Sequence, residues 1–316
     1  MVLTEKIDKL KKEIRKVIIG KELEVELMAI SLLFNGHILL ESVPGTGKTM
    51  LAKSFAKSIG GEFSRIQFTP DVLPSDVTGI QFFNPKTQEF ELRPGPILAN
   101  IVLADEINRA TPRTQSSLLE VMEERQVTID GETVRLPEPF MVIATQNPVE
   151  SQQGTFPLPV AQMDRFFLKI KVGYPDFEDE KKVLQLHRGT RIQNNINQVF
   201  PLSEIEQLKI AVNEIFISNE TEDYLITLVR KTREHNYIEL GVSPRGTLAL
   251  MKAAQGKALL NGRKYVTPDD VKAVAPYVLG HRIFLSIEGA LTKTAETIIA
   301  EILNSIPVPV EVGLNG

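Results

Sequence analysis

Short apolar runs alternate with amphipathic stretches along residues 1–172. The runs with the pattern of buried or alternating strands are residues 38–40, 63–68, 101–104, 141–145 and 167–172. Residues 3–16 and 50–59 instead place apolar side chains at helical spacing. Alternation of strands with helices predicts an α/β fold built on a parallel sheet.

Two segments of this region have the pattern of β-hairpins. Residues 80–92 contain two strand-like runs around the breaker-rich turn 84–88, and residues 126–136 contain two around Asp130 and Gly131. A doubly wound fold places only helices where the first hairpin lies, so we expect residues 80–92 to be an insertion. Insertions of this kind often contact a partner or a substrate.

After the breaker cluster at residues 173–176 the pattern becomes helical. Periodicity and helix start signals predict helices at residues 177–188, 203–215, 220–235, 243–261, 268–279 and 288–304. The change of pattern predicts two domains, an α/β domain at residues 1–175 and a helical domain at residues 176–316.

Composition adds limits to this picture. A chain of 316 residues has room for a large core in about two domains. The formal net charge of −4 gives no overall attraction to nucleic acid or to an anionic membrane, and the absence of cysteine excludes disulfides and thiolate metal sites. No apolar run approaches the ~20 residues of a membrane helix, and residues 1–12 are charged and unlike a signal peptide, so we expect a cytoplasmic protein.

The strongest chemical signal lies between the first apolar run and the helical stretch that follows it. This glycine-rich segment consists of Val43, Pro44, Gly45, Thr46, Gly47, Lys48 and Thr49. Glycines let backbone N–H groups surround phosphate oxygens, and the N-terminus of the following helix adds its dipole. We expect Lys48 to reach the β- and γ-phosphates of a nucleotide and the Thr49 hydroxyl to bind Mg²⁺. Ser42 stands where the motif usually begins with glycine, a change we interpret as tolerated because it precedes the phosphate-facing turn.

Two carboxylates end the apolar run 101–104. Asp105 and Glu106 follow it directly, and ligands of open α/β sheets bind at the carboxyl ends of the strands. There Asp105 would hold Mg²⁺ through its water shell, and Glu106 would orient and polarise the attacking water. Asn147 follows the run 141–145 at the same sheet edge, where its amide could hold the water or the γ-phosphate. A strand-terminating Asn-Pro turn is the alternative for Asn147.

Further candidates have alternatives that the residues alone leave open. Ile19 and Gly20 end a short apolar segment of the kind that commonly lies beside an adenine ring, and a turn packed on the core would explain it equally well. Arg165 is either an ion-pair partner of Asp164 or a cation for a transferring phosphoryl group.

Arg245 falls in the first turn of a predicted helix. Ser243 is a suitable N-cap and Pro244 a suitable first helical residue. A helix dipole disfavours a cation at this position, and a nearby phosphate would offset the cost. An exposed arginine that tolerates the dipole is the alternative.

This set of motifs resembles the AAA+ ATPases, and within them the MoxR family, over nearly the whole chain. The matching segments are residues 45–49, 103–110, 114–120, 124–127, 144–148, 164–166 and 243–245. The resemblance implies an AAA+ P-loop αβα sandwich with a parallel sheet, followed by an all-helical lid domain. The hairpins at 80–92 and 127–136 would be its helix-2 and pre-sensor-1 inserts.

The resemblance also implies roles for single residues in an ATPase that uses ATP and Mg²⁺. Asn147 would be sensor 1, Arg165 a finger that reaches the nucleotide of a neighbouring subunit, and Arg245 sensor 2. Whether Arg245 reads the nucleotide of its own subunit or of a neighbour stays open, because the lid of this clade is displaced. Arg109 and Arg113 are further candidates for a neighbour's nucleotide, and the sequence does not choose.

By the same resemblance we expect a homo-oligomeric ring, hexameric in form, whose pore the two inserts face. The family is implied to comprise chaperone-like ATPases that remodel or mature other proteins, often alongside partners with von Willebrand factor A domains. We therefore expect a protein client, whose identity the sequence does not give.

Two other classes of function are alternatives. Related AAA+ proteins with similar hairpins drive DNA unwinding, but residues 71–93 carry Lys86 and Arg93 against four carboxylates, and Arg135 stands against three in the second hairpin. A pore lined in this way would repel phosphate, which disfavours a nucleic-acid motor. The other alternative is a nucleotide-gated binding module with low turnover.

Overall fold

The structure is a computed structural model that describes residues 3–147, 154–188 and 196–309. By its contacts the chain forms two compact units, residues 5–207 and residues 208–309, the latter together with Leu3 and Thr4. Within the described ranges, no helix is long and apolar enough to cross a membrane.

The segment 196–207 groups with the first unit. Val199 and Phe200 donate their backbone N–H groups to the carbonyl oxygen of Ser58, at 2.7 and 3.2 Å. Because of such contacts, the first unit extends beyond residue 175, the position at which the sequence pattern changes. The domain boundary at residue 175 stays a prediction.

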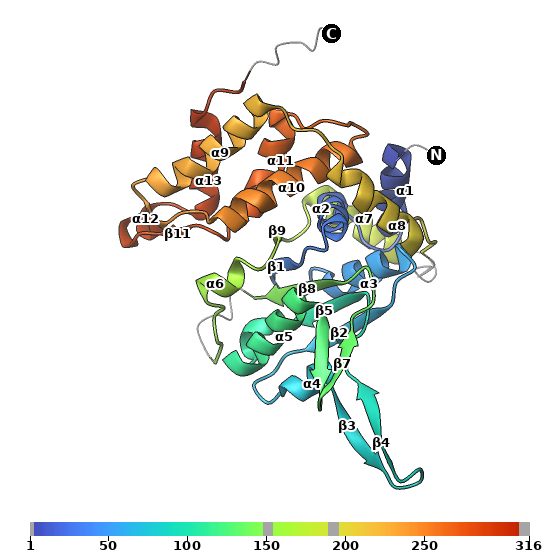
Figure 1. Ribbon diagram of the computed structural model, residues 1–316. Helices are drawn as coiled ribbons and strands as arrows, with labels where there is room; N and C mark the ends of the chain where they lie inside the picture. Colours follow the sequence, from blue (N-terminus) through green and yellow to red (C-terminus); the bar gives the residue numbers. More distant parts are fainter. Residues whose placement is uncertain (1–2, 148–153, 189–195, 310–316) are drawn as a thin grey trace. The chain divides into compact units, whose positions relative to one another are not determined.

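The first unit is built on a five-stranded parallel sheet in the order β2-β5-β8-β1-β9 (Figure 1). Its strands are β1 (Ile38–Ser42), β2 (Phe63–Gln67), β5 (Ile101–Asp105), β8 (Met141–Gln146) and β9 (Leu168–Val172). Because all neighbours are parallel, the carboxyl ends of the strands meet at one edge of the sheet. The predicted parallel sheet is confirmed.

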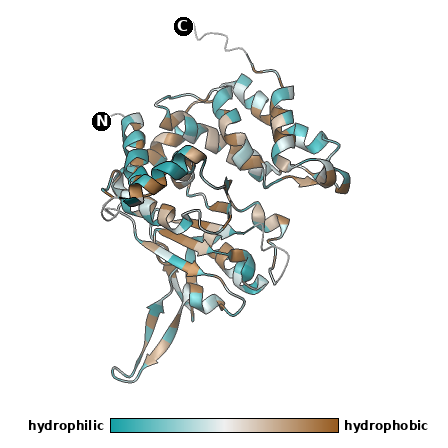
Figure 2. Ribbon diagram, turned by 180° about the vertical axis from the view of Figure 1, so that it is seen from behind, coloured by the Kyte–Doolittle hydropathy of each residue, from teal (hydrophilic) through white to brown (hydrophobic). Residues whose placement is uncertain are grey.

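Helices pack against this sheet through their apolar positions. The helices before residue 189 are α1 (Leu3–Arg15), α2 (Glu22–Leu33), α3 (Lys48–Ser58), α4 (Pro74–Thr78), α5 (Pro112–Glu124), α6 (Val160–Met163) and α7 (Phe177–Arg188). Leu51 and Phe55 of α3 are buried, and Leu118 of α5 belongs to a buried cluster with Val102 and Val142 of the sheet. In Figure 2 the central strands are largely coloured as hydrophobic, which fits a sheet buried on both faces.

Both predicted hairpins are present. β3 (Gly79–Asn84) pairs with β4 (Glu89–Pro94), and β6 (Gln126–Ile129) pairs with β7 (Glu132–Arg135), each antiparallel (Figure 1). The turn residue Asp130 accepts a hydrogen bond from the backbone N–H of Gln81 at 3.2 Å. This bond joins the tip of the second hairpin to a strand of the first.

The second unit is helical apart from one small sheet. Its elements are the latter part of α8 (Leu202–Asn213), α9 (Asn219–Glu234), α10 (Pro244–Leu260), α11 (Pro268–Leu279), α12 (Ile287–Thr292) and α13 (Ala295–Ser305), with the strands β10 (Ile238–Leu240) and β11 (Phe284–Leu285). The antiparallel pair β10-β11 was not predicted, because strands this short carry no periodic signal.

The single helix predicted at residues 288–304 is wrong. The chain forms α12 and α13, separated at Lys293 and Thr294. Thr294 has extended backbone geometry, and its side chain accepts a hydrogen bond from the N–H of Thr297, so it caps a new helix. Apolar periodicity continues across the break, which explains the error.

Candidate nucleotide-binding site

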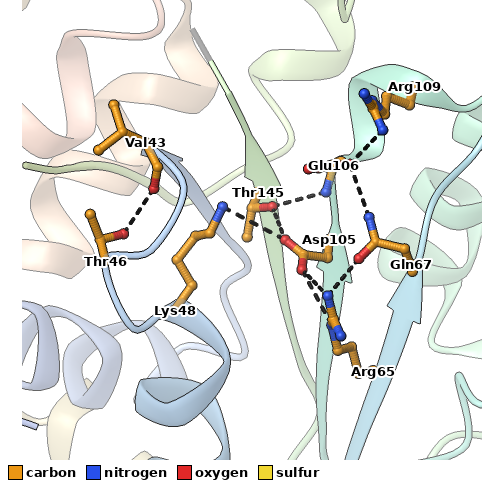
Figure 3. Close-up of polar contacts among 9 residues, drawn as sticks. All are labelled: Val43, Thr46, Lys48, Arg65, Gln67, Asp105, Glu106, Arg109 and Thr145. Atoms are coloured by element: carbon orange, nitrogen blue, oxygen red, sulfur yellow. Dashed lines mark hydrogen bonds and ion pairs between the residues drawn. The ribbon is translucent and has the colours of Figure 1, made fainter. Parts of the chain in front are cut away.

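The glycine-rich segment forms a loop between β1 and α3, as its sequence predicts. Gly45 and Gly47 have φ angles of 81° and 82°, in the left-handed region that favours glycine. The Thr46 hydroxyl donates to the carbonyl oxygen of Val43 at 3.1 Å and holds the turn closed (Figure 3). The α3 helix begins after Gly47 without a side-chain cap, which leaves its first N–H groups available to an anion.

A cavity of about 630 Å³ adjoins this loop. Its lining includes the predicted site residues Pro44, Gly45, Gly47, Lys48, Thr49, Asp105 and Glu106. The structure therefore brings the phosphate loop and the two carboxylates at the end of β5 to one place. Lys53 and Lys57 of α3 also line the cavity and add positive charge suited to a polyanionic ligand.

Asp105 is buried, and both of its carboxylate oxygens are faced by donors (Figure 3). The hydroxyl of Thr145, on the neighbouring strand β8, donates to Oδ1 at 2.6 Å, and Nζ of Lys48 lies 3.8 Å from the same oxygen. Oδ2 accepts two N–H groups of Arg65, from Nη2 at 2.7 Å and from Nε at 3.2 Å. Donors from β8 and β2 therefore fix the position of this carboxylate.

Glu106 has backbone geometry that is rare for a residue with a side chain. Its φ angle is 58°, in the left-handed region, and such strain persists only where neighbouring contacts hold it. The N–H of Glu106 donates to the Thr145 hydroxyl at 2.9 Å, and its carboxylate forms an ion pair with Nη1 of Arg109 at 3.2 Å. Glu106 is one of the residues that line the cavity.

Sequence reasoning missed Arg65 and Gln67. Both belong to β2, two residues apart, so they project from the same face of the strand. The guanidinium of Arg65 donates to Oε1 of Gln67 at 2.5 Å, and the amide of Gln67 donates to Oε2 of Glu106 at 3.0 Å (Figure 3). Only the alternation of β2 could have indicated which of its residues face the site.

Asn147 lies directly after β8 and is buried. Because β8 pairs in parallel with β5, with Ala144 opposite Ala104, Asn147 emerges at the sheet edge that carries Asp105 and Glu106. This placement agrees with the expected one. Its contact with water or phosphate stays a prediction.

Arg165 is engaged within its own chain. Nη1 lies 3.0 Å from a carboxylate oxygen of Glu123 and donates to the carbonyl oxygen of Leu119 at 3.2 Å. Both partners belong to α5, so the guanidinium is held against that helix. Its action on a neighbouring nucleotide stays a prediction.

The segment proposed to lie beside the adenine packs close to the phosphate loop. Val17 lines the cavity, and a Cβ atom on Gly47 would lie 2.6 Å from Cδ1 of Ile18. Ile19 and Gly20 follow directly without lining the cavity, and Gly20 has a φ angle of 72°. The adenine contact of these two residues stays a prediction.

The remaining arginines are placed as follows. Arg245 lies in the first turn of α10 in the second unit, and the N-cap role of Ser243 is confirmed because its hydroxyl accepts the N–H of Gly246 at 3.3 Å. Arg113 lies in the first turn of α5. Roles for Arg245, Arg109 and Arg113 at a nucleotide stay predictions.

Comparisons with known proteins show which family models and relatives this chain is similar to. Residues 37–168 match the family model "ATPase family associated with various cellular activities (AAA)", and residues 230–302 match the AAA lid domain. An uncharacterized protein of Bacillus subtilis, YeaC, is 51% identical over 299 residues, which cover 94% of this chain and 93% of that protein.

Chaperone MoxR1 of Mycobacterium tuberculosis is 41% identical over 307 residues, which cover 94% of this chain and 81% of that protein. The crystal structure of a proposed ATPase from Cytophaga hutchinsonii has a TM-score of 0.90 and 39% sequence identity, and covers 98% of this chain and 96% of that one. The matched segments include the phosphate loop, Asp105 and Glu106. This chain therefore belongs to the MoxR family of AAA+ ATPases.

Proposed function

We propose that the chain is a Mg²⁺-dependent ATPase that assembles as a homo-oligomeric, hexameric ring and couples ATP hydrolysis to remodelling or maturation of a partner protein. The observation that carries the proposal is the shared cavity, which joins the phosphate loop with Asp105 and Glu106. The name of the Mycobacterium tuberculosis relative, Chaperone MoxR1, supports the chaperone-like role. A client or partner with a von Willebrand factor A domain and a cytoplasmic location belong to the same proposal.

The residues at the site fit Mg²⁺ bound together with a nucleotide. Mg²⁺ takes oxygen ligands and is commonly held by one or two carboxylates with substrate phosphates. Thr49 and Asp105 line the same cavity, and they would hold the ion. When bound, Mg²⁺ neutralises charge that develops on the transferring phosphoryl group.

The chain's own residues would then carry the hydrolysis. Lys48 and the N–H groups of the loop bind the β- and γ-phosphates. Glu106 orients and polarises a water molecule for attack on the γ-phosphorus, while the bond from that phosphorus to the bridging oxygen breaks and leaves ADP and phosphate. Asn147 would hold the water or the γ-phosphate from the end of β8.

The test of this assignment is Glu106→Gln. The amide retains the size of the side chain but not its basicity, so we expect ATP binding to persist while hydrolysis falls by at least ~100-fold. Glu132→Gln, on the second hairpin, is a control for the loss of one carboxylate. Binding is measured with a fluorescent ATP analogue and turnover by phosphate release. Near-normal hydrolysis by Glu106→Gln would remove Glu106 from the water-orienting role.

The ring is tested by the dependence of activity on protein concentration. A site completed by a neighbouring Arg165 requires hydrolysis per subunit to rise with concentration, and Arg165→Ala should abolish this rise without weakening ATP binding. Sedimentation in the presence of the nucleotide gives the number of subunits. If hydrolysis per subunit does not depend on protein concentration and Arg165→Ala does not change it, the site is complete within one chain.

A further inference from the structure

We propose that Arg65 is a positioning residue that competes with the divalent cation for Asp105, so that cation binding at this site requires the guanidinium of Arg65 to leave. The inference deepens the proposed ATPase function and depends on it. It concerns how the site passes from the arrangement in Figure 3 to one that holds Mg²⁺ with a nucleotide.

Asp105 already has several donors around its carboxylate. A carboxylate offers about four lone-pair sites. Arg65 fills the two of Oδ2 with Nη2 at 2.7 Å and Nε at 3.2 Å. On Oδ1, Thr145 donates at 2.6 Å and Lys48 lies at 3.8 Å. Lys48 is beyond hydrogen-bond distance, so it faces the remaining site of Oδ1 without filling it. A cation held through Asp105, directly or through water, must therefore either take the place of Arg65 at Oδ2 or lie beside the ammonium of Lys48 at Oδ1.

The groups around Asp105 differ in how freely they can move. Thr145 is fully buried, and its hydroxyl also accepts the N–H of Glu106, so it is fixed. Lys48 is the proposed ligand of the β- and γ-phosphates, and its side chain is only 12% exposed. The side chain of Arg65 is 45% exposed and lies on β2, an edge strand of the sheet. A long, half-exposed side chain can turn into solvent with a gain of rotamer freedom, so Arg65 is the donor that leaves.

Arg65 also has a hydrogen bond outside Asp105. Its Nη2 also donates to Oε1 of Gln67, whose amide donates to Oε2 of Glu106. When Arg65 leaves Asp105, Gln67 loses the donor that orients its amide toward Glu106. Binding of a cation at Asp105 thus changes the hydrogen bonding of Glu106, the water-orienting residue, through Arg65 and Gln67 on one face of β2.

The test measures the Mg²⁺ concentration required for half-maximal binding of a fluorescent, slowly hydrolysed ATP analogue to the full chain. Arg65→Ala removes the competitor, so this midpoint should fall about fivefold to tenfold relative to wild type, as for a partly screened ion pair. Lys86→Ala, which removes a positive charge from the turn of the first hairpin, outside the lining of the cavity, should leave the midpoint within about twofold. Arg65→Gln provides a second variant of similar size if Arg65→Ala does not fold.

Two companion measurements separate the explanations. In EDTA, the loss of the counter-ion of a buried carboxylate should lower the melting temperature of Arg65→Ala, and Mg²⁺ should restore it further than in wild type. An unchanged or higher Mg²⁺ midpoint in a folded Arg65 variant would overturn the proposal. So would an equal loss of analogue affinity with and without Mg²⁺, because Arg65 would then be a phosphate ligand. Failure of wild type to bind the analogue at any Mg²⁺ concentration would instead overturn the proposed ATPase function itself.

Discussion

The restraint on Arg165 provides a sharp test of the shared-site mechanism. In this chain Nη1 of Arg165 lies 3.0 Å from Glu123 and also donates to the carbonyl oxygen of Leu119. If Arg165 acts on the nucleotide of a neighbouring subunit, the ion pair with Glu123 competes with that action. Glu123→Gln keeps the length of the side chain and removes only the charge.

The magnitude follows from the exposure of the pair. The side chains of Arg165 and Glu123 are 34% and 41% exposed, so solvent screens their attraction. A partly exposed pair of this kind is worth about 0.5–1 kcal/mol, which corresponds to a factor of about two to five in the population of the released arginine. The carbonyl bond to Leu119 remains in the variant, so no larger effect is expected.

The assay is phosphate release per subunit over a range of protein concentrations, for wild type, Glu123→Gln, Arg165→Ala and the double variant. We expect Glu123→Gln to raise hydrolysis about twofold to fivefold where assembly is partial, and the double variant to behave as Arg165→Ala. Glu120→Gln, one turn earlier on α5, controls for the change of charge on that helix. A loss of activity in Glu123→Gln would refute the reasoning, because the pair would then position Arg165 for its task instead of withholding it.

Three further predictions concern binding and stability. The Ser42 hydroxyl is fully buried and has no hydrogen-bond partner among the described residues, so Ser42→Ala should stabilise the protein by about 1 kcal/mol in urea unfolding, and a destabilised variant would contradict this. Gly47→Ala should weaken ATP binding by at least ~10-fold, because a Cβ atom is strained at a φ angle of 82° and would lie too close to Ile18. Calorimetry measures this affinity, and an unchanged value would contradict the prediction. Burial lowers the pKa of His37 from its ordinary 6.5 to about 4, so the folded state binds fewer protons between these values. This difference should lower the free energy of unfolding of wild type by about 3 kcal/mol as pH falls from about 6.5 to about 4. His37→Gln should lack this contribution, and parallel plots of unfolding free energy against pH for the two proteins would contradict the prediction.

The sequence predicts the strands and helices well where the period is strong. The buried runs that became β1, β5 and β8 are continuous apolar segments, and α9 to α11 carry both periodicity and start signals. The two hairpins were recognised from their breaker-rich turns. The small sheet β10-β11 was not predicted, because its strands are too short to show an alternating pattern. The break between α12 and α13 was not predicted either, because no glycine or proline marks the point where the helical periodicity is interrupted.

Some residues of the candidate site could be predicted from the sequence and others could not. The phosphate loop, Asp105 and Glu106 were found because glycines and carboxylates at strand ends have few structural uses at that spacing. Arg65 and Gln67 could not be found, since a polar residue on an alternating strand is expected at any solvent-facing position. Their contacts with Asp105 and Glu106 depend on the register of β2 against β5, with Gln67 opposite Asp105, which local sequence does not encode.

Two arginines balance the charges of Asp105 and Glu106. Asp105 and Glu106 are each paired within the first unit, Asp105 with Arg65 and Glu106 with Arg109. If the proposed function holds, a nucleotide with Mg²⁺ would bring both negative and positive charge to the same cavity, and the existing pairs would have to rearrange before the carboxylates act on metal and water. On the proposed function, Arg65 and Arg109 would therefore oppose the reactive arrangement, and the affinity of the site for Mg²⁺ would reflect this competition as much as the chemistry of Asp105 itself.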